Sequence, residues 1–185
     1  GCDYRCTFCV VPYTRGPERS RNLAAVVEEV RALADAGTGE VTLLGQTVNS
    51  WNDGSHDFGD LLRAVGAVDG IRRGRFTSPY PTDFTDSVIA AMAETEAVCE
   101  HVHLPVQSGS NAVLRRMLRR YTTEKYLDVV ARLRAAMPDV TFSTDIIVGF
   151  PGETEAQFEE TLAIVPEAGF DDAYTFKYSV REGTP

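Results

Sequence analysis

The chain has 185 residues, of which 43% are hydrophobic, and a formal net charge of -9 at pH 7. This length suits one domain with a sizeable core. No apolar run approaches the ~18 residues that a membrane span requires, and no signal peptide is visible, so we expect no membrane partner. The negative charge argues against this chain alone gripping a nucleic acid through its phosphates.

Arginines cluster locally despite this acidic balance. The clusters are Arg15, Arg19 and Arg21; Arg72, Arg73 and Arg75; and Arg115, Arg116, Arg119 and Arg120. Arginine runs on helix faces are more often solvated surface than binding sites. We therefore assign no function to any cluster on its own.

Three cysteines, Cys2, Cys6 and Cys9, open the chain with the spacing Cys-x-x-x-Cys-x-x-Cys. Three thiolates can ligate three irons of a [4Fe–4S] cluster and leave the fourth iron without a protein ligand. A structural zinc site usually has four ligands, and no second Cys-x-x-Cys or close histidine pair follows. A zinc-stapled, non-catalytic interaction domain is the alternative hypothesis. Cys99, at the start of a predicted strand, is interpreted as a small buried hydrophobe.

The predicted elements follow from hydrophobic periodicity and from capping residues. Asn22 is a plausible cap for the first helix, and Thr154 with Gln157 forms a capping box for the last, which ends near Gly169. In chain order we predict a helix at 23–33, a strand at 41–44, a helix at 58–65, a strand at 75–77, a helix at 86–94, a strand at 101–104, helices at 113–118 and 126–137, a strand at 141–148, a helix at 155–168 and a strand at 173–178.

Five strands that alternate with helices predict a parallel α/β architecture. Periodicity does not distinguish a barrel from a doubly wound sheet. The chain begins at Gly1, almost on the cysteine run, and ends at Pro185 without a terminal element. These ends predict a segment of a longer protein.

Several sequence runs carry a family resemblance. The cysteine spacing followed by strand–helix repeats resembles the radical S-adenosylmethionine (SAM) superfamily. The whole chain is similar to its methylthiotransferase branch in the runs CTFCVVPYTRG at 6–16, SR at 20–21, LLGQTVN at 43–49, HLPVQSGS at 103–110, DIIVGFPGE at 145–153 and REGTP at 181–185.

The resemblance implies an open (β/α)6 partial TIM barrel, here without strand one, that fills residues 1–185 as a single radical SAM core domain. In that superfamily SAM chelates the open iron, and the reduced [4Fe–4S] cluster cleaves SAM to a 5′-deoxyadenosyl radical. An N-terminal methylthiotransferase domain with a second [4Fe–4S] cluster, and a C-terminal RNA-binding barrel, are expected outside this segment.

The runs at 10–16 and 43–49 most resemble the bacterial tRNA-modifying branch, which adds a methylthio group at C2 of N6-dimethylallyladenosine beside the anticodon. The ribosomal-protein branch, which modifies an aspartate, is the alternative. This resemblance implies tRNA as a partner of the full-length protein, an electron donor such as flavodoxin or ferredoxin, and a monomer. Thiols that ligate a cluster argue for a reducing cytoplasm.

Residues near the cysteines and in the middle of the chain are the first candidates for holding SAM. Phe8 takes the position of an aromatic near the SAM adenine, with packing beneath the cysteine loop as its alternative. Gln46 stands where many relatives have a glutamate that holds the SAM amino group, so its carbonyl oxygen would take over. Gln107 and Ser108 follow a strand and are assigned to the ribose or carboxylate, whereas Ser110 is assigned as a helix cap.

Asp145 and Gly149 complete the SAM candidates. Asp145 lies within a strand, where a buried carboxylate needs a polar partner such as the ribose or a structural arginine. Gly149 allows the backbone to approach the adenine closely. Tyr13, Arg15 and Arg21 could face substrate RNA, by stacking and by phosphate contact, and surface packing is their alternative.

Overall fold

Parallel strands form the centre of the computed structural model, which describes residues 1–184. In one sheet β1 pairs with β2, and in the other β3, β4 and β5 pair in that order, always in parallel. A parallel bridge between Gly74 and Val98 joins the two sheets, so the strands follow one another in chain order. Their bounds are β1 (Glu40–Leu43), β2 (Arg73–Phe76), β3 (His101–His103), β4 (Thr141–Val148) and β5 (Asp172–Lys177).

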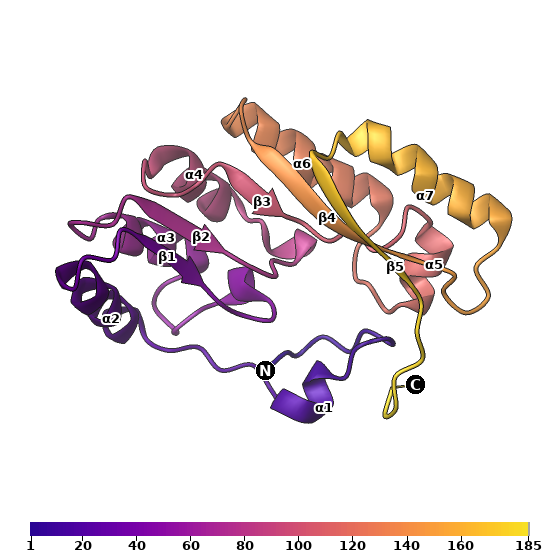
Figure 1. Ribbon diagram of the computed structural model, residues 1–185, viewed down its shortest axis with the longest axis horizontal. Coiled ribbons are helices and arrows are strands. Elements are labelled where there is room, and N and C mark those ends of the chain that lie inside the picture. The colour runs from indigo at the N-terminus through magenta and orange to yellow at the C-terminus, as the bar shows by residue number, and fades with distance from the viewer. Residues whose placement is uncertain (185) are drawn as a thin grey trace.

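Helices connect successive strands, as parallel pairing requires. Figure 1 shows α4, α6 and α7 along one side of the strands, whereas the N-terminal segment with α1 runs across the other side. The helices are α1 (Val11–Arg15), α2 (Leu23–Asp35), α3 (Phe58–Gly66), α4 (Asp86–Glu94), α5 (Asn111–Arg116), α6 (Thr123–Ala136) and α7 (Glu155–Ala168), with short 3-10 turns η1 (Val48–Ser50) and η2 (Pro81–Asp83).

The predicted fold class is confirmed. All strand pairs are parallel, and within residues 1–184 no pairing closes β5 onto β1, which is the form of an open partial barrel. The predicted strands are shifted by at most two residues at either end. The short helix α1 was not predicted, because five residues are too few to show periodicity.

The helix that follows β4 begins and ends as the sequence predicts. Thr154 accepts the backbone N–H of Gln157, the Gln157 side chain accepts the N–H of Thr154, and α7 stops at Gly169 with φ 61°. Glycine is favoured there because the left-handed conformation strains residues that carry a Cβ.

One expectation for an individual residue, Cys99, was wrong, and another, Ser110, was confirmed in position but not in its hydrogen bond. Cys99 is partly exposed rather than buried, in the bridging segment just before β3. Ser110 occupies the N-cap position of α5, but its buried hydroxyl has no hydrogen-bond partner among residues 1–184. The N–H of Ser110 instead donates to the hydroxyl of Ser108.

Buried hydroxyl groups fix the turn that leaves β3. Tyr126 and Thr144 donate to the carbonyl of Leu104 at 2.7 and 2.8 Å, and Thr144 accepts the N–H of Val106. Tyr126 is fully buried, and burial raises its pKa, so it remains a protonated donor. Because every polar group of this turn is bonded, the following residue, Gln107, is held in one position.

No helix within residues 1–184 combines the length and the apolar composition needed to cross a bilayer.

Candidate cluster and cofactor site

The three cysteine thiols lie on one loop at the carboxyl-end edge of the strands. Cys6 is buried, Cys2 and Cys9 are partly exposed, and all three are free thiols. The N–H of Cys9 donates to the carbonyl of Cys6 at 3.0 Å, which closes a turn between two of the thiols. Thr7 ties the loop to the end of α5, because its N–H donates to the carbonyl of Met117 and its hydroxyl to that of Arg116.

The donor set of the loop is three free thiols. A cubane binds each of three thiolates to a different iron, whereas a structural zinc ion usually has four ligands. Among the described residues, no group of three His, Cys, Asp or Glu side chains is arranged to hold a metal ion. Burial raises the pKa of Cys2, and the neighbouring Cys6 and Cys9 add to the rise. Cations bound between these thiols would reverse that effect and keep them as thiolates.

Arg119 places a positive charge beside the thiols, a contact that the sequence did not predict. Its Nη1 donates to Sγ of Cys6 at 3.4 Å, and its Nε donates to the hydroxyl of Tyr121 at 3.0 Å. Burial lowers the pKa of Arg119, yet Tyr121, Cys6 and Tyr80 together raise it above its ordinary value. The interpretation of this arginine as solvated surface was therefore wrong. The preceding residue, Leu118, has φ 55°, in the left-handed region.

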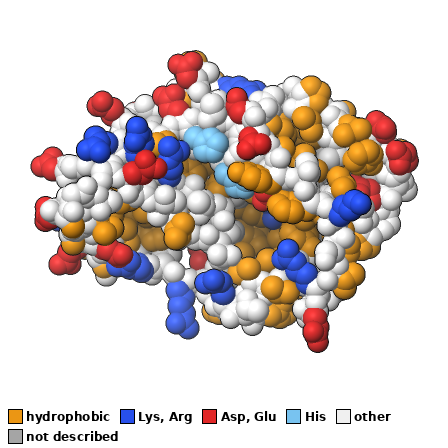
Figure 2. All heavy atoms as spheres, in the orientation of Figure 1, with side chains coloured by type: hydrophobic (Ala, Val, Ile, Leu, Met, Phe, Trp, Pro, Cys, Tyr) orange, Lys and Arg blue, Asp and Glu red, His pale blue; other side chains and the backbone are white. Residues whose placement is uncertain are grey.

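A cavity of about 370 Å³ adjoins the cysteine loop and brings together four of the predicted site residues. They come from the cysteine loop, the turn after β3, and β4, and the segment at and after β5 completes the wall. The lining residues are Phe8, Cys9, Gln107, Asp145, Ile147, Phe176, Lys177, Tyr178, Ser179 and Arg181. Figure 2 shows this face of the molecule hollowed, with hydrophobic side chains around the hollow.

Gln107 is held at the wall of this cavity by backbone contacts. Its N–H donates to the carbonyl of Asp145 at 2.8 Å, and its own carbonyl accepts the N–H of Ile147 at 2.9 Å. Gln107 has φ 67°, a left-handed conformation that costs energy outside glycine and that clusters at functional sites. Ser108 turns away from the cavity: it is fully buried, and its hydroxyl shares a hydrogen bond of 3.2 Å with Thr161.

The protein partner of Asp145 is a histidine and not a structural arginine, which was one of the two partners expected from the sequence; the other, the ribose, stays a prediction. Nε2 of His103 lies 3.4 Å from Oδ2 of Asp145, and Nδ1 of His103 is hydrogen-bonded to the hydroxyl of Ser143 at 2.9 Å. The Asp145 side chain keeps 30% of its surface exposed. It therefore retains room for a second polar partner in the cavity.

Packing of Phe8 beneath the cysteine loop is confirmed, and its place near the SAM adenine stays a prediction. It lines the cavity, and it also packs against the small buried cluster of Val113, Met117 and Phe150. Gly149 has φ 70° in the turn after β4 and does not line this cavity. The carboxylate of Glu153 accepts the N–H of Gly149, so this backbone is already engaged.

Gln46 lies in a different hollow, of about 450 Å³. It is exposed, and Gly1 and Arg15 share the hollow with it. Tyr13 is 58% exposed, with the guanidinium of Arg5 5.8 Å from its ring centre. These positions leave Arg15 and Tyr13 accessible beside the cysteine loop.

Arg21, unlike Arg15 and Tyr13, has its side chain engaged by neighbouring residues. It forms an ion pair with Glu29 and donates to the carbonyl of Ala25 at 3.3 Å, both on α2. Its own carbonyl accepts the indole N–H of Trp51. Its contacts are those of a residue that packs locally on the surface.

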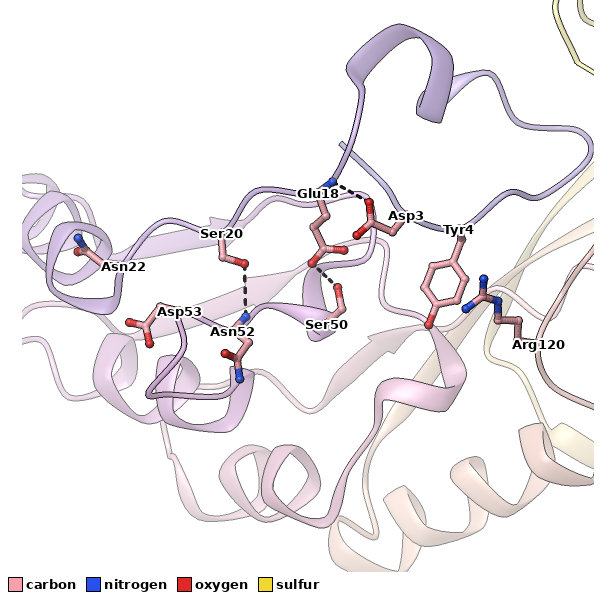
Figure 3. Close-up of a pocket in the computed structure, with 9 residues that line it drawn as sticks. All are labelled: Asp3, Tyr4, Glu18, Ser20, Asn22, Ser50, Asn52, Asp53 and Arg120. Carbon is pink, nitrogen blue, oxygen red and sulfur yellow. Dashed lines mark hydrogen bonds between the residues drawn. The ribbon is translucent and has the colours of Figure 1, made fainter.

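A third, larger cavity of about 740 Å³ is polar and was not predicted. Figure 3 shows that Asp3 and Tyr4 of the cysteine loop form one end of it, and that Glu18 and Ser50 are joined across it by a hydrogen bond of 2.6 Å. Tyr4 donates to the carboxylate of Asp83 at 3.1 Å. Burial raises the pKa of Tyr4 to about 12 and raises that of Asp83, so Tyr4 remains a donor at ordinary pH.

Comparison with known proteins places the chain in a family and finds similar curated proteins. The family model of the radical SAM superfamily matches residues 1–165. The tRNA-2-methylthio-N(6)-dimethylallyladenosine synthase of Salinispora arenicola is 60% identical over the whole chain, which covers 38% of that protein. The protein of the same name from Alkaliphilus oremlandii is 55% identical, with 40% covered. The chain thus spans well under half the length of these relatives.

Solved structures share the fold at low sequence identity. The radical SAM methyltransferase TsrM from Kitasatospora setae aligns with a TM-score of 0.77 at 21% identity, over 96% of this chain and 35% of that one. Methylornithine synthase aligns with a TM-score of 0.67 at 17% identity, over 100% of this chain and 52% of that one. Together with the family match, these findings show that the chain belongs to the radical SAM superfamily, whose enzymes use a [4Fe–4S] cluster and SAM.

Proposed function

We propose that this chain is the radical-generating domain of a tRNA methylthiotransferase, which adds a methylthio group at C2 of N6-dimethylallyladenosine beside the anticodon. The observation that carries the proposal is 54–60% identity along the whole chain to synthases named for that product. The relatives compared carry the tRNA name, which favours this substrate over a ribosomal-protein aspartate. The family match likewise favours an iron–sulfur cluster over a zinc staple.

The chemistry needs a cofactor, because the C2–H bond of an adenine offers a side-chain base no useful acidity. When bound, the reduced cluster supplies the electron that cleaves SAM to methionine and a 5′-deoxyadenosyl radical. Cys2, Cys6 and Cys9 would hold three irons of the cluster, and the guanidinium of Arg119 would offset the negative charge of the thiolates. The iron without a protein ligand would be open to the amino and carboxylate groups of SAM.

The rest of SAM fits the cavity of about 370 Å³ beside Cys9. The Asp145 carboxylate and the Gln107 amide would bond the ribose, since a carboxylate accepts from two hydroxyls and an amide can donate or accept. The ring of Phe8 supplies an apolar surface for the adenine. Gln46, across the loop beside Gly1, would accept from the amino group of SAM. We assign Ser108 to support of Gln107 through the packed turn.

Sulfur insertion needs more than these residues. The chain has four cysteines, and Cys99 is far in sequence from the triplet, so a second cluster would take its ligands from elsewhere in the full-length protein. Because the chain is acidic, most of the tRNA affinity would also come from elsewhere, with Tyr13 and Arg15 touching the RNA near the cluster loop. We propose a monomer of the cytoplasm, reduced by a flavodoxin or ferredoxin.

Removing a cluster ligand should abolish cluster assembly. Cys9→Ala, reconstituted with iron and sulfide without oxygen, should lose the broad visible absorption and all SAM cleavage, because no spare thiol lies on the loop. Cys99→Ala is the matched control and should retain both. The measurement is iron content with the visible spectrum. Loss of the cluster in Cys99→Ala, with retention in Cys9→Ala, would contradict the assignment.

Neutralising Asp145 should weaken SAM binding. Asp145→Asn should raise the dissociation constant of SAM by about tenfold, the size of a lost hydrogen bond to a charged group. Thr141→Ala, on the same strand but at its far end, should bind SAM normally. Calorimetric titration of the cluster-loaded protein gives both values. An unchanged SAM affinity with a lower melting temperature would make Asp145 a purely structural carboxylate.

Residues 1–185 alone should carry out the first half of the reaction, the cleavage of SAM, without the second half, the methylthiolation. Loaded with cluster and reduced, they should convert SAM to 5′-deoxyadenosine but form no methylthiolated nucleoside, since the ligands of a second cluster are not among them. Both products are assayed by mass spectrometry in one mixture that contains the substrate tRNA. Methylthiolated nucleoside from these residues alone would refute the proposed division of labour.

A further inference from the structure

Two tyrosines and two arginines form a continuous column beneath the cysteine loop. The rings of Tyr4 and Tyr80 stack with centroids 3.9 Å apart and an interplanar angle of 15°. The guanidinium of Arg120 lies 5.1 Å from the centre of the Tyr4 ring, and that of Arg119 lies 4.7 Å from the centre of the Tyr80 ring. The stacked pair therefore carries a cation at each end, an arrangement that the ring quadrupoles favour.

The column joins three segments that are far apart in the sequence. Tyr4 comes from the cysteine loop, Tyr80 from the loop between β2 and α4, and the two arginines from the turn between α5 and α6. Figure 3 shows Arg120 beside the ring of Tyr4 at the edge of the polar cavity. Hence a single stack fixes the cysteine loop against two separate parts of the barrel.

Hydrogen bonds hold the side chains of the column to neighbouring groups at both ends and in the middle. Tyr4 donates to both carboxylate oxygens of Asp83, at 3.3 and 3.1 Å, and the hydroxyl of Tyr80 accepts the N–H of Arg120 at 2.8 Å. At the inner end Arg119 donates to Sγ of Cys6. The column thus ends on a thiol of the cysteine triplet.

Tyr4 lies between Cys2 and Cys6, in the half of the loop that Thr7 does not anchor. Among residues 1–184, the backbone N–H of Cys2 donates to the carbonyl of Gly16, on the same N-terminal segment. The stack, the Asp83 bond and the contact of Arg119 with Cys6 tie this half of the loop to the barrel. Loops without such contacts sample many conformations, and ordering them on binding costs affinity.

We infer that Tyr4 is a positioning residue, which holds the Cys2–Cys6 half of the loop in the conformation that receives the cluster and keeps Cys6 against Arg119. The ordering of the loop by Tyr4 does not depend on the proposed function. Its consequence, the geometry in which SAM meets the cluster, rests on that function. The stack, the Asp83 bond and the Arg119 contact involve protein side chains alone.

The first test needs no cluster. In the metal-free protein, Tyr4→Leu should speed alkylation of Cys6 by iodoacetamide about fivefold or more, because thiol reactivity follows access. Cys99, outside the loop, should react at its usual rate in the same sample. Tyr4→Phe keeps the stack and should restore most of the protection. Phe58→Leu, a buried ring of the α3 core, should lower the melting temperature without selective exposure of Cys6.

The second test uses the protein with its cluster. In Tyr4→Leu the electron paramagnetic resonance spectrum of the reduced cluster should broaden, and the SAM dissociation constant should rise about fivefold, as expected for an unordered loop. Arg120→Met, which removes only the exposed outer cation, should shift both values in the same direction by less. Should Tyr4→Leu fail to assemble a cluster, the alkylation rate of Cys6 in the metal-free protein still decides the question.

The outcomes separate this role from the proposed function. Equal protection of Cys6 in Tyr4→Leu and the unaltered protein, or equal acceleration at Cys99, would overturn the positioning role. A wild-type protein that assembles no cluster while Tyr4 still protects Cys6 would overturn the proposed function and leave the ordering intact. Tyr4→Phe behaving like Tyr4→Leu would also overturn the role of the stack.

Discussion

The charge of Arg119 beside Cys6 is the interaction on which the site depends. A partly buried guanidinium is costly unless its donors and its charge are satisfied. Here Tyr121 accepts from Nε, Tyr80 offers its ring, and Cys6 accepts from Nη1. Each of these groups is in turn fixed, Tyr121 by donating to the carbonyls of Pro105 and Val106. The cysteine loop and the turn after β3 therefore share one polar centre.

That shared centre explains how residues so distant in sequence form one cavity. Pro105 and Val106 immediately precede Gln107, which is bonded to the backbone of β4 on both sides of Ile146. Asp145 lies in the same strand, β4, with His103 of the neighbouring strand β3 beside it. Since parallel strands present their carboxyl ends at one edge, loops gathered there can combine one cofactor site from separate motifs.

The sequence predicted the elements better than the contacts. The capping box at Thr154 and Gln157 and the end at Gly169 are local chemistry, so α7 was predicted correctly at both ends. Asp145 was placed correctly on its strand, yet its partner His103 was not foreseen. That pairing depends on the register of two strands forty residues apart, which no local pattern encodes.

Arginines were the least predictable residues. Arg119 and Arg120 belong to one basic run, but Arg119 donates to Cys6, whereas Arg120 is exposed and lies over the ring of Tyr4. Arg21, for which the sequence left RNA contact and surface packing open, forms an exposed ion pair with Glu29 of α2. Long flexible side chains take their partners from tertiary structure, so charge patterns in a sequence do not show which arginines remain free.

The binding of SAM to an open iron on the cysteine loop is tested most directly by Mössbauer spectroscopy of the protein reconstituted with ⁵⁷Fe, before and after SAM is added. Three thiolate ligands predict one iron site distinct from the others, whose isomer shift changes when SAM binds. A spectrum in which the iron sites are equivalent and unchanged by SAM would contradict an open coordination position at Cys2, Cys6 and Cys9.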